Sequence, residues 1–287
     1  SDVYKRQRLE NVSWRLGFYQ ADLVVPGGAD YLSLSFDRAA QDIHLYRPGV
    51  DPARPGLWAP GYLRFLRAHR PTVLRAMDLT HTNNNWLTKW SERQTPTGPR
   101  LGEISRTLPV EWGEEKLSGE RGLSWEAVFD LCNQTRSDCW INVPLLADRD
   151  YMEQLARLAR LKLSAPHKLW IEYSNELWND GFWQTHVNRT LAGGGDKTTY
   201  GLDYDKSGDP VAWGDRRVAA KLYEMAQIFR RAWAGQTGRL RPVLAYQWAN
   251  PDRTRGQLEY LQARYGAPKG YLYSLAVAPY VLSLIHI

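Results

Sequence analysis

The stretch Lys168–Gln184, with the sequence KLWIEYSNELWNDGFWQ, places a carboxylate beside several aromatic side chains. Its first half, Lys168–Ser174, is rich in aromatic and apolar residues and predicts a buried strand. Asn175 and Glu176 come where that strand ends, so the scaffold would hold the Glu176 carboxyl at a cleft. Aromatic rings that can stack on a ligand and exclude water follow at Trp178, Phe182 and Trp183. Removal of water from a carboxyl group favours its protonated form, which is the form that a general acid needs. The alternative is that Glu176 only caps a helix.

The composition limits the kinds of protein this chain can be. Its 287 residues, 43% of them hydrophobic, suffice for one large domain, or for one domain with a small companion. The 13 tryptophans suit the flat faces of sugar rings, but they can also fill a large core. The net charge is +6, yet basic and acidic residues are interleaved without a basic stripe, so we expect no nucleic-acid partner. We also expect no membrane span, because the apolar run at 271–287 is short and contains Ser, Pro and Tyr. No obligate protein partner is evident from the sequence.

The hydrophobic pattern changes along the chain. Residues 8–50 alternate in short apolar runs between turn signals, which predicts a β-rich decorating region, part of a sandwich-like insertion. Residues 61–281 alternate strand and helix patterns, which predicts parallel strands joined by right-handed crossovers. The predicted strands are Thr72–Leu79, Cys139–Val143, Lys168–Ser174, Pro242–Trp248 and Tyr271–Pro279. The predicted helices are Gly61–His69, one capped by Ser124, one capped by Asp148, one that starts at Pro210, and Thr254–Tyr265.

Two parallel-sheet architectures fit this alternation, a doubly wound sheet and a (β/α)8 barrel. No glycine-rich phosphate loop follows any predicted strand, which disfavours the dinucleotide-binding version of the doubly wound sheet. The glycine-rich segment Gly193–Gly208 is predicted to be a polar connection. Cys132 and Cys139 either close a small disulfide loop or remain two buried thiols, and no metal-ligand spacing surrounds them.

The segment IEYSNELWN resembles the fourth barrel strand of clan A glycoside hydrolases, the retaining (β/α)8 enzymes that include cellulases, mannanases and xylanases. In that clan an Asn-Glu pair ends the strand, often with another Glu four positions earlier, and Asn175, Glu176 and Glu172 match this arrangement. The segments RAMDLTHTNNNW and NVPLLADRDYM, together with this one, are also similar to a less characterised group of secreted bacterial barrel proteins. The resemblance spans about Gly61–Tyr280 and implies an α/β fold with a partial TIM barrel, strands two to six.

The resemblance also implies roles for individual residues. Glu176 would be the general acid/base, and Asn175 would hydrogen-bond the sugar 2-hydroxyl. The nucleophile of the clan is a Glu that ends strand seven, which we expect beyond the end of this chain. Tyr280 matches a strand-six Tyr that often contacts the nucleophile, or it is simply a tyrosine at the barrel rim. No cofactor is implied.

Further candidates follow from their positions at strand ends. Glu172 and Glu176 are an even number of residues apart, so their side chains point to the same face of the strand, with Glu172 deeper inside the barrel. A buried carboxylate needs a partner, and we predict an ion pair between Glu172 and Arg75. Asp78 and Asn142 either line the cleft or only satisfy backbone groups near it. Aromatic residues after strand ends are candidates to stack on sugar, with some of them in the core: Trp86, Trp90, Trp178, Trp183 and Trp248.

Taken together, the sequence predicts a secreted, extracellular bacterial glycosidase that acts on β-linked polysaccharide or oligosaccharide by a retaining mechanism. The alternative is a carbohydrate-binding barrel protein without catalysis. The ends SDVYKRQ and LSLIHI resemble translated sequencing-adapter tails of metagenomic reading frames. We therefore expect residues 1–7 and 282–287 to be foreign, which makes the absence of a signal peptide uninformative. Because the barrel would be incomplete, we also expect this fragment to be inactive and prone to oligomerise through its open sheet edges.

Overall fold

The chain divides into two compact units, Ser1–Gly56 and Leu57–Ile287. A computed structural model describes residues 8–15, 18–24, 56–96 and 122–278. In the first unit, β1 (Arg8–Arg15) pairs antiparallel with β2 (Phe18–Val24), and the register shifts between Glu10 and Ser13. The rest of the predicted β-rich region, residues 25–50, lies outside the described residues.

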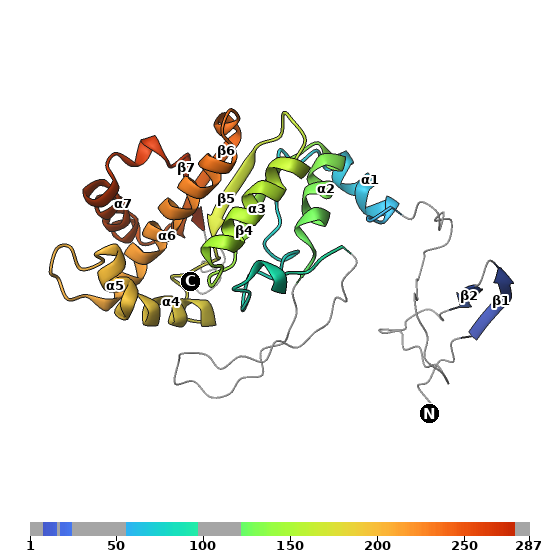
Figure 1. The fold of residues 1–287 in the computed structure, drawn as a ribbon, viewed down its shortest axis with the longest axis horizontal. Coiled ribbons are helices and arrows are strands. Elements are labelled where there is room, and N and C mark those ends of the chain that lie inside the picture. Colours follow the sequence, from blue (N-terminus) through green and yellow to red (C-terminus); the bar gives the residue numbers. More distant parts are fainter. Residues whose placement is uncertain (1–7, 16–17, 25–55, 97–121, 279–287) are drawn as a thin grey trace, which may run out of the picture. The chain divides into compact units, whose positions relative to one another are not determined.

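The second unit is built on a curled, parallel five-stranded sheet that forms a half-barrel (Figure 1). The strand order follows the sequence, and the strands are β3 (Val73–Arg75), β4 (Asp138–Val143), β5 (Leu169–Tyr173), β6 (Leu240–Gln247) and β7 (Ser274–Ala278). The register places Glu172 on β5 between Asn142 on β4 and Val243 on β6. The predicted mixed α/β class with a parallel sheet is therefore confirmed.

Seven α-helices belong to the described part of this unit. They are α1 (Pro60–His69), α2 (Trp125–Thr135), α3 (Arg149–Lys162), α4 (Trp183–Gly193), α5 (Gly195–Tyr200), α6 (Pro210–Ala232) and α7 (Pro251–Tyr265). The predicted caps are present: Ser124 Oγ accepts from the Ala127 N–H at 3.3 Å, and Asp148 Oδ1 accepts from the Tyr151 N–H at 2.8 Å. Such caps satisfy donors that a helix N-terminus otherwise leaves without partners.

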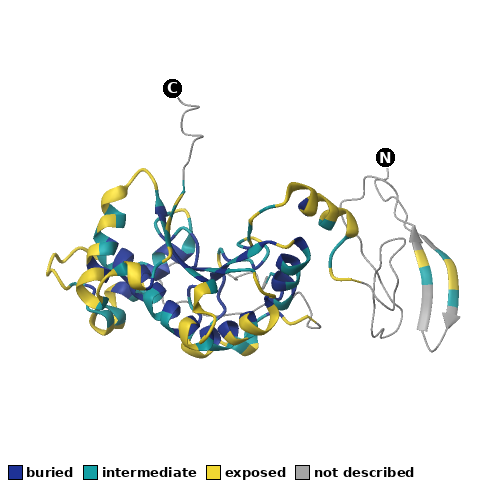
Figure 2. Ribbon diagram, turned by 90° about the horizontal axis from the view of Figure 1, so that it is seen from above, coloured by how far each residue is buried: buried dark blue, intermediate teal, exposed yellow. Residues whose placement is uncertain are grey.

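The two faces of the sheet differ in composition, as the two-residue alternation of a strand requires. The side chains of Cys139, Ile141 and Ile171 are fully buried in the core against the helices (Figure 2). The alternate residues lie on the inner face of the curl, where Trp140 and Trp170 stack with ring centroids 5.7 Å apart. Trp233, at the end of α6, is buried and donates from Nε1 to the Ala156 carbonyl.

Several predicted segments differ from the structure; the strand predicted at Tyr271–Pro279, for example, begins at Ser274. The strand predicted at Thr72–Leu79 stops at Arg75, because Thr80 Oγ1 and Thr82 Oγ1 bind the carbonyls of Ala76 and Met77 and fold the chain into turns. The Gly193–Gly208 connection contains the short helix α5. Helix α7 begins at Pro251, three residues before the predicted Thr254, since a proline fits the first turn of a helix.

Cys132 and Cys139 are both buried and both free, so they are two thiols in this structure. Burial, with Cys132 close by, raises the pKa of the Cys139 thiol well above its ordinary value. None of the described helices is both long enough and apolar enough to cross a bilayer.

Candidate functional site

The backbone makes a tight turn where β5 ends. Ser174 and Glu176, on either side of Asn175, have φ angles of +55° and +45°. The loop after β3 contains two more residues with left-handed backbones, His81 at +49° and Asn84 at +55°. Residues other than glycine adopt this conformation at a cost of roughly 1 kcal/mol or more, and they gather at functional sites. The two strand ends therefore carry the kind of backbone that a binding site often requires.

Glu172 forms the predicted ion pair with Arg75. Arg75 Nη2 lies 3.0 Å from Glu172 Oε1 and 2.9 Å from Oε2, and Arg75 Nε donates to Oε2 at 3.2 Å. Trp140 Nε1 donates to the same Oε2 at 2.8 Å, and Glu172 is only 2% exposed. Burial raises the pKa of Glu172, while Arg75 acts in the opposite direction. Glu172 is thus a buried carboxylate whose hydrogen-bonding capacity is used inside the protein.

Asn175 lies directly above this pair and is held on two sides. Its Oδ1 accepts from Arg75 Nη2 at 3.0 Å, and its Nδ2 donates to Asn83 Oδ1 at 3.0 Å. Gln184, at the start of α4, donates from Nε2 to Asn83 Oδ1 at 2.7 Å and to the Asn175 carbonyl at 3.1 Å. Neither partner was predicted from the sequence: Asn83 belongs to a polar run after a strand, which is a weak signal, and no pattern marks Gln184.

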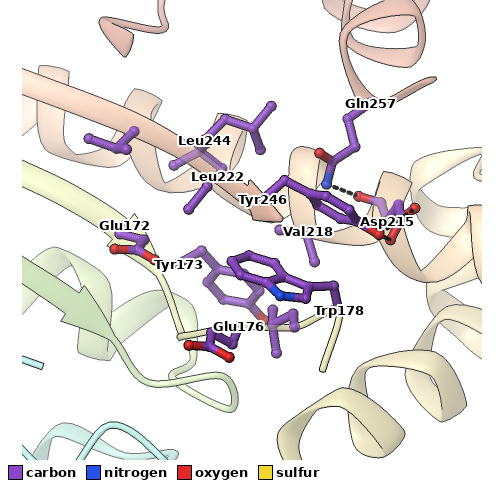
Figure 3. Close-up of a pocket in the computed structure, with 13 residues that line it drawn as sticks. Glu172, Tyr173, Glu176, Trp178, Asp215, Val218, Leu222, Leu244, Tyr246 and Gln257 are labelled. Carbon is purple, nitrogen blue, oxygen red and sulfur yellow. Dashed lines mark hydrogen bonds between the residues drawn. The ribbon is translucent and has the colours of Figure 1, made fainter. Parts of the chain in front are cut away.

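Glu176 is partly exposed and has a neutral partner. Asn179 Nδ2 donates to Glu176 Oε2 at 2.9 Å, and Asn179 Oδ1 accepts from the Gly181 N–H at 3.0 Å, which fixes the orientation of the Asn179 amide. Glu176 lines a pocket with Trp178 and Tyr246, whose rings are 5.1 Å apart (Figure 3). A carboxyl group beside aromatic rings and a neutral amide can exchange a proton with a ligand without breaking an ion pair.

A third carboxylate, Asp215 on α6, lines the same pocket and was not found from the sequence. Figure 3 shows it beside Tyr246 and Gln257, apart from Glu172 and Glu176. Asp215 forms an ion pair with Arg253 and accepts from the Tyr246 hydroxyl at 3.3 Å. Burial raises the pKa of Asp215, and Arg253 opposes that rise. Its contacts therefore tie α6 to β6 and α7.

The predicted tryptophans fall into different environments. Trp178 is partly exposed and lines the pocket with Glu176, Trp183 is also partly exposed, and Trp248 follows β6 with 56% of its surface exposed. Trp86 is only 4% exposed and meets Trp183 in an edge-on contact, so its ring is a core side chain and is not open to a ligand. Trp90 packs edge-on against Tyr151.

The remaining candidates do not join Glu176. Asn142 is buried and donates from Nδ2 to the Ser174 carbonyl at 2.7 Å, so it supports the turn after β5. Asp78 lines a separate cavity of about 330 Å³ with Tyr62 and Leu74, beside β3. Tyr280 lies outside the described residues.

Comparisons of the chain with protein-family models, with curated proteins and with solved structures found no match. Within the described ranges, no three His, Cys, Asp or Glu side chains gather as a metal site. Function is therefore inferred from the strand-end geometry and from the sequence resemblance.

Proposed function

We propose that this chain is part of a retaining glycoside hydrolase that acts on β-linked polysaccharide or oligosaccharide. In this proposal the half-barrel sheet represents strands two to six of a (β/α)8 barrel, β3 to β7 here, in an extracellular bacterial enzyme that needs no cofactor. The observation that carries the proposal is the position of Asn175 and Glu176 at the carboxyl end of β5, above the Glu172–Arg75 ion pair. Parallel α/β barrels keep their sites at this end of the strands.

The proposed chemistry assigns one step to each polar group. Glu176 protonates the glycosidic oxygen of the leaving group and later removes a proton from the attacking water. Asn175 donates its second N–H to the sugar 2-hydroxyl, a bond that strengthens as positive charge develops on the ring. Trp178 packs against the sugar and excludes water from Glu176.

A mechanism that retains the anomeric configuration also requires a second carboxylate about 5 Å from the first. Glu172 and Asp215 line the pocket, but each is committed to an arginine, Arg75 and Arg253 respectively. We therefore assign the nucleophile to a residue outside the described part of the chain, as the resemblance implies. The pairing of Glu172 and Asp215 with arginines also favours the second candidate, a carbohydrate-binding barrel protein that lacks catalysis.

Calorimetric titration of the chain with β-1,4-linked hexasaccharides of glucose, mannose and xylose tests the carbohydrate site. We expect one of them to bind with a dissociation constant of about 1 mM or below, a binding free energy of roughly −4 kcal/mol or better. Asn175→Ala should weaken that binding at least tenfold. Leu161→Ala, on the far side of α3 with 78% of the leucine exposed, serves as the control. Absence of binding by all three sugars at about 10 mM would overturn the proposal.

Hydrolysis is then measured on a longer protein that joins this chain to the proposed strand seven with its carboxylate. NMR of the released sugar should show the retained β-anomer first. Glu176→Gln should slow hydrolysis by about 10²–10⁴-fold, the usual contribution of a general acid. Sugar binding without hydrolysis in that longer protein would favour the carbohydrate-binding alternative.

A further inference from the structure

We infer that Asn83 and Gln184 form an amide clamp around Asn175, in which Gln184 is a positioning residue and Asn83 is a second donor to a sugar hydroxyl. The clamp is defined as the side chains of Asn83, Asn175 and Gln184. It joins the loop after β3, the end of β5 and the first turn of α4. The positioning role rests on hydrogen bonds alone, whereas the sugar contact of Asn83 rests on the proposed function.

The oxygen of Asn83 is the centre of the clamp. Asn83 Oδ1 accepts from Gln184 Nε2 at 2.7 Å and from Asn175 Nδ2 at 3.0 Å, and an amide oxygen has two lone pairs. Gln184 is 1% exposed, and its oxygen accepts from the Asn84 N–H at 3.2 Å. Rotating the Asn83 amide by half a turn would set its NH2 group against two other NH2 groups. Gln184 thus fixes the orientation of Asn83.

The orientation of Asn175 is fixed by the same bonds. Its oxygen faces the Arg75 guanidinium, and one of its N–H groups faces Asn83. A flipped Asn175 amide would bring an NH2 group against Arg75 and two oxygens against each other. Asn175 is 3% exposed, and the clamp fixes which of its N–H groups makes no bond to a described residue. A fixed amide orientation of this kind is the preorganisation that a binding site needs.

The clamp also determines what Asn83 offers to a ligand. Since its oxygen faces Asn175 and Gln184, its NH2 group points the other way, and no described residue accepts a hydrogen bond from it. Asn83 is partly exposed. Two neighbouring amides that both present N–H groups suit acceptors such as the neighbouring hydroxyls of one neutral sugar unit. Asn83 is therefore assigned to the same sugar as Asn175.

Helix α4 provides a matched control for a purely structural role. Asn188 lies one turn after Gln184 and is equally buried, at 1% exposure. Its Nδ2 donates to the Gly214 carbonyl at 2.9 Å and its Oδ1 accepts from Arg217 at 2.9 Å, so it ties α4 to α6, outside the clamp. Gln184→Met and Asn188→Leu both replace a satisfied buried amide by an apolar side chain of similar shape.

The positioning role is tested by NMR of the side-chain NH2 groups in the ¹⁵N-labelled chain. The Asn175 signal is assigned by its loss in Asn175→Ala. Gln184→Met should shift this signal and speed its exchange with water at least tenfold, whereas Asn188→Leu should leave it unchanged. If Gln184→Met does not fold, Asn83→Ala removes the acceptor at a partly exposed position and should release Asn175 in the same way. An unchanged Asn175 signal in the folded clamp variants would overturn the clamp.

The sugar contact of Asn83 is tested with the hexasaccharide that binds the chain best. Asn83→Asp keeps the accepting oxygen of the clamp but loses the NH2 group, so the Asn175 signal should persist while binding weakens at least tenfold. Asn188→Leu should bind within twofold of the unaltered chain. Unaltered binding by Asn83→Asp would remove Asn83 from the site. If no hexasaccharide binds the unaltered chain, the proposed function and the sugar contact both fail, and the NMR result still decides the positioning role.

Discussion

Glu172 and Glu176 are four residues apart in the sequence, yet they occupy opposite kinds of environment. Glu172 lies within β5, is buried, and is neutralised by Arg75 with a further bond from Trp140. Glu176 lies after the strand on a left-handed backbone, is partly exposed, and is held by the neutral amide of Asn179. The strand end separates the two environments: the carboxylate inside the sheet is paired with an arginine, and the one beyond it is partly exposed and has an amide as its partner.

The largest effect should come from removing the cation of the buried pair. Arg75→Met leaves Glu172 buried without its countercharge, and we expect a loss of about 3–5 kcal/mol in the free energy of unfolding at pH 7, toward the lower end because the arginine is one-third exposed. Urea unfolding measures this loss. The double variant Arg75→Met/Glu172→Gln should be more stable than Arg75→Met alone. A loss below about 1 kcal/mol would contradict the assigned role of the pair.

Glu172→Gln should have a smaller and pH-dependent effect. Near pH 4 the protonated carboxyl carries one O–H, whereas the glutamine carries two N–H groups. The extra N–H must face the donors of Arg75 or Trp140, which we expect to destabilise the chain by about 1–3 kcal/mol. Because burial raises the pKa of Glu172, the folded chain keeps this proton at pH values where the unfolded chain releases it. The stability that Glu172 contributes is therefore full below about pH 4.3 and declines as the pH rises above it. Urea unfolding from pH 4 to 7 should show that the free energies of unfolding of the unaltered chain and of Glu172→Gln become more similar as the pH rises. A difference that grows with pH would mean that folding lowers the pKa of Glu172.

Substitutions of Glu176 should change stability least. Glu176→Gln keeps the size of the side chain, so we expect a change within about 0.5 kcal/mol. Glu176→Gly should stabilise the chain by about 0.5–1 kcal/mol, because glycine adopts the left-handed conformation without strain. Thermal and urea unfolding measure both. A loss of more than about 1 kcal/mol in Glu176→Gln would place Glu176 among the structural residues instead.

Features that depend on local periodicity were predicted from the sequence. The parallel strands, the caps at Ser124 and Asp148, and the Glu172–Arg75 pair follow from alternation along a strand or from spacing along a helix. The length of β3 was overestimated, because two threonine hydroxyls compete for carbonyls that a strand would have used. Such competition has no distinctive sequence pattern.

Features that depend on contacts between distant segments were not predicted. Asn83 and Gln184 are about 100 residues apart, and their meeting depends on how α4 packs over the loop after β3. Asp215 reaches the pocket from the helix layer, where a sequence pattern indicates only a buried face. Trp86 was placed correctly after a strand, but it is buried in contact with Trp183 on α4, a distant segment of the chain.

The most direct test of the difference between Glu172 and Glu176 is NMR of their ¹³C-labelled carboxyl groups during titration with the best-bound hexasaccharide. Glu176→Gln and Glu172→Gln assign the two signals. The proposed site predicts that the sugar changes the Glu176 signal in proportion to occupancy and leaves the Glu172 signal unchanged. A bound sugar that moves the Glu172 signal alone, or neither signal, would contradict the assignment of Glu176 as the group that faces the substrate.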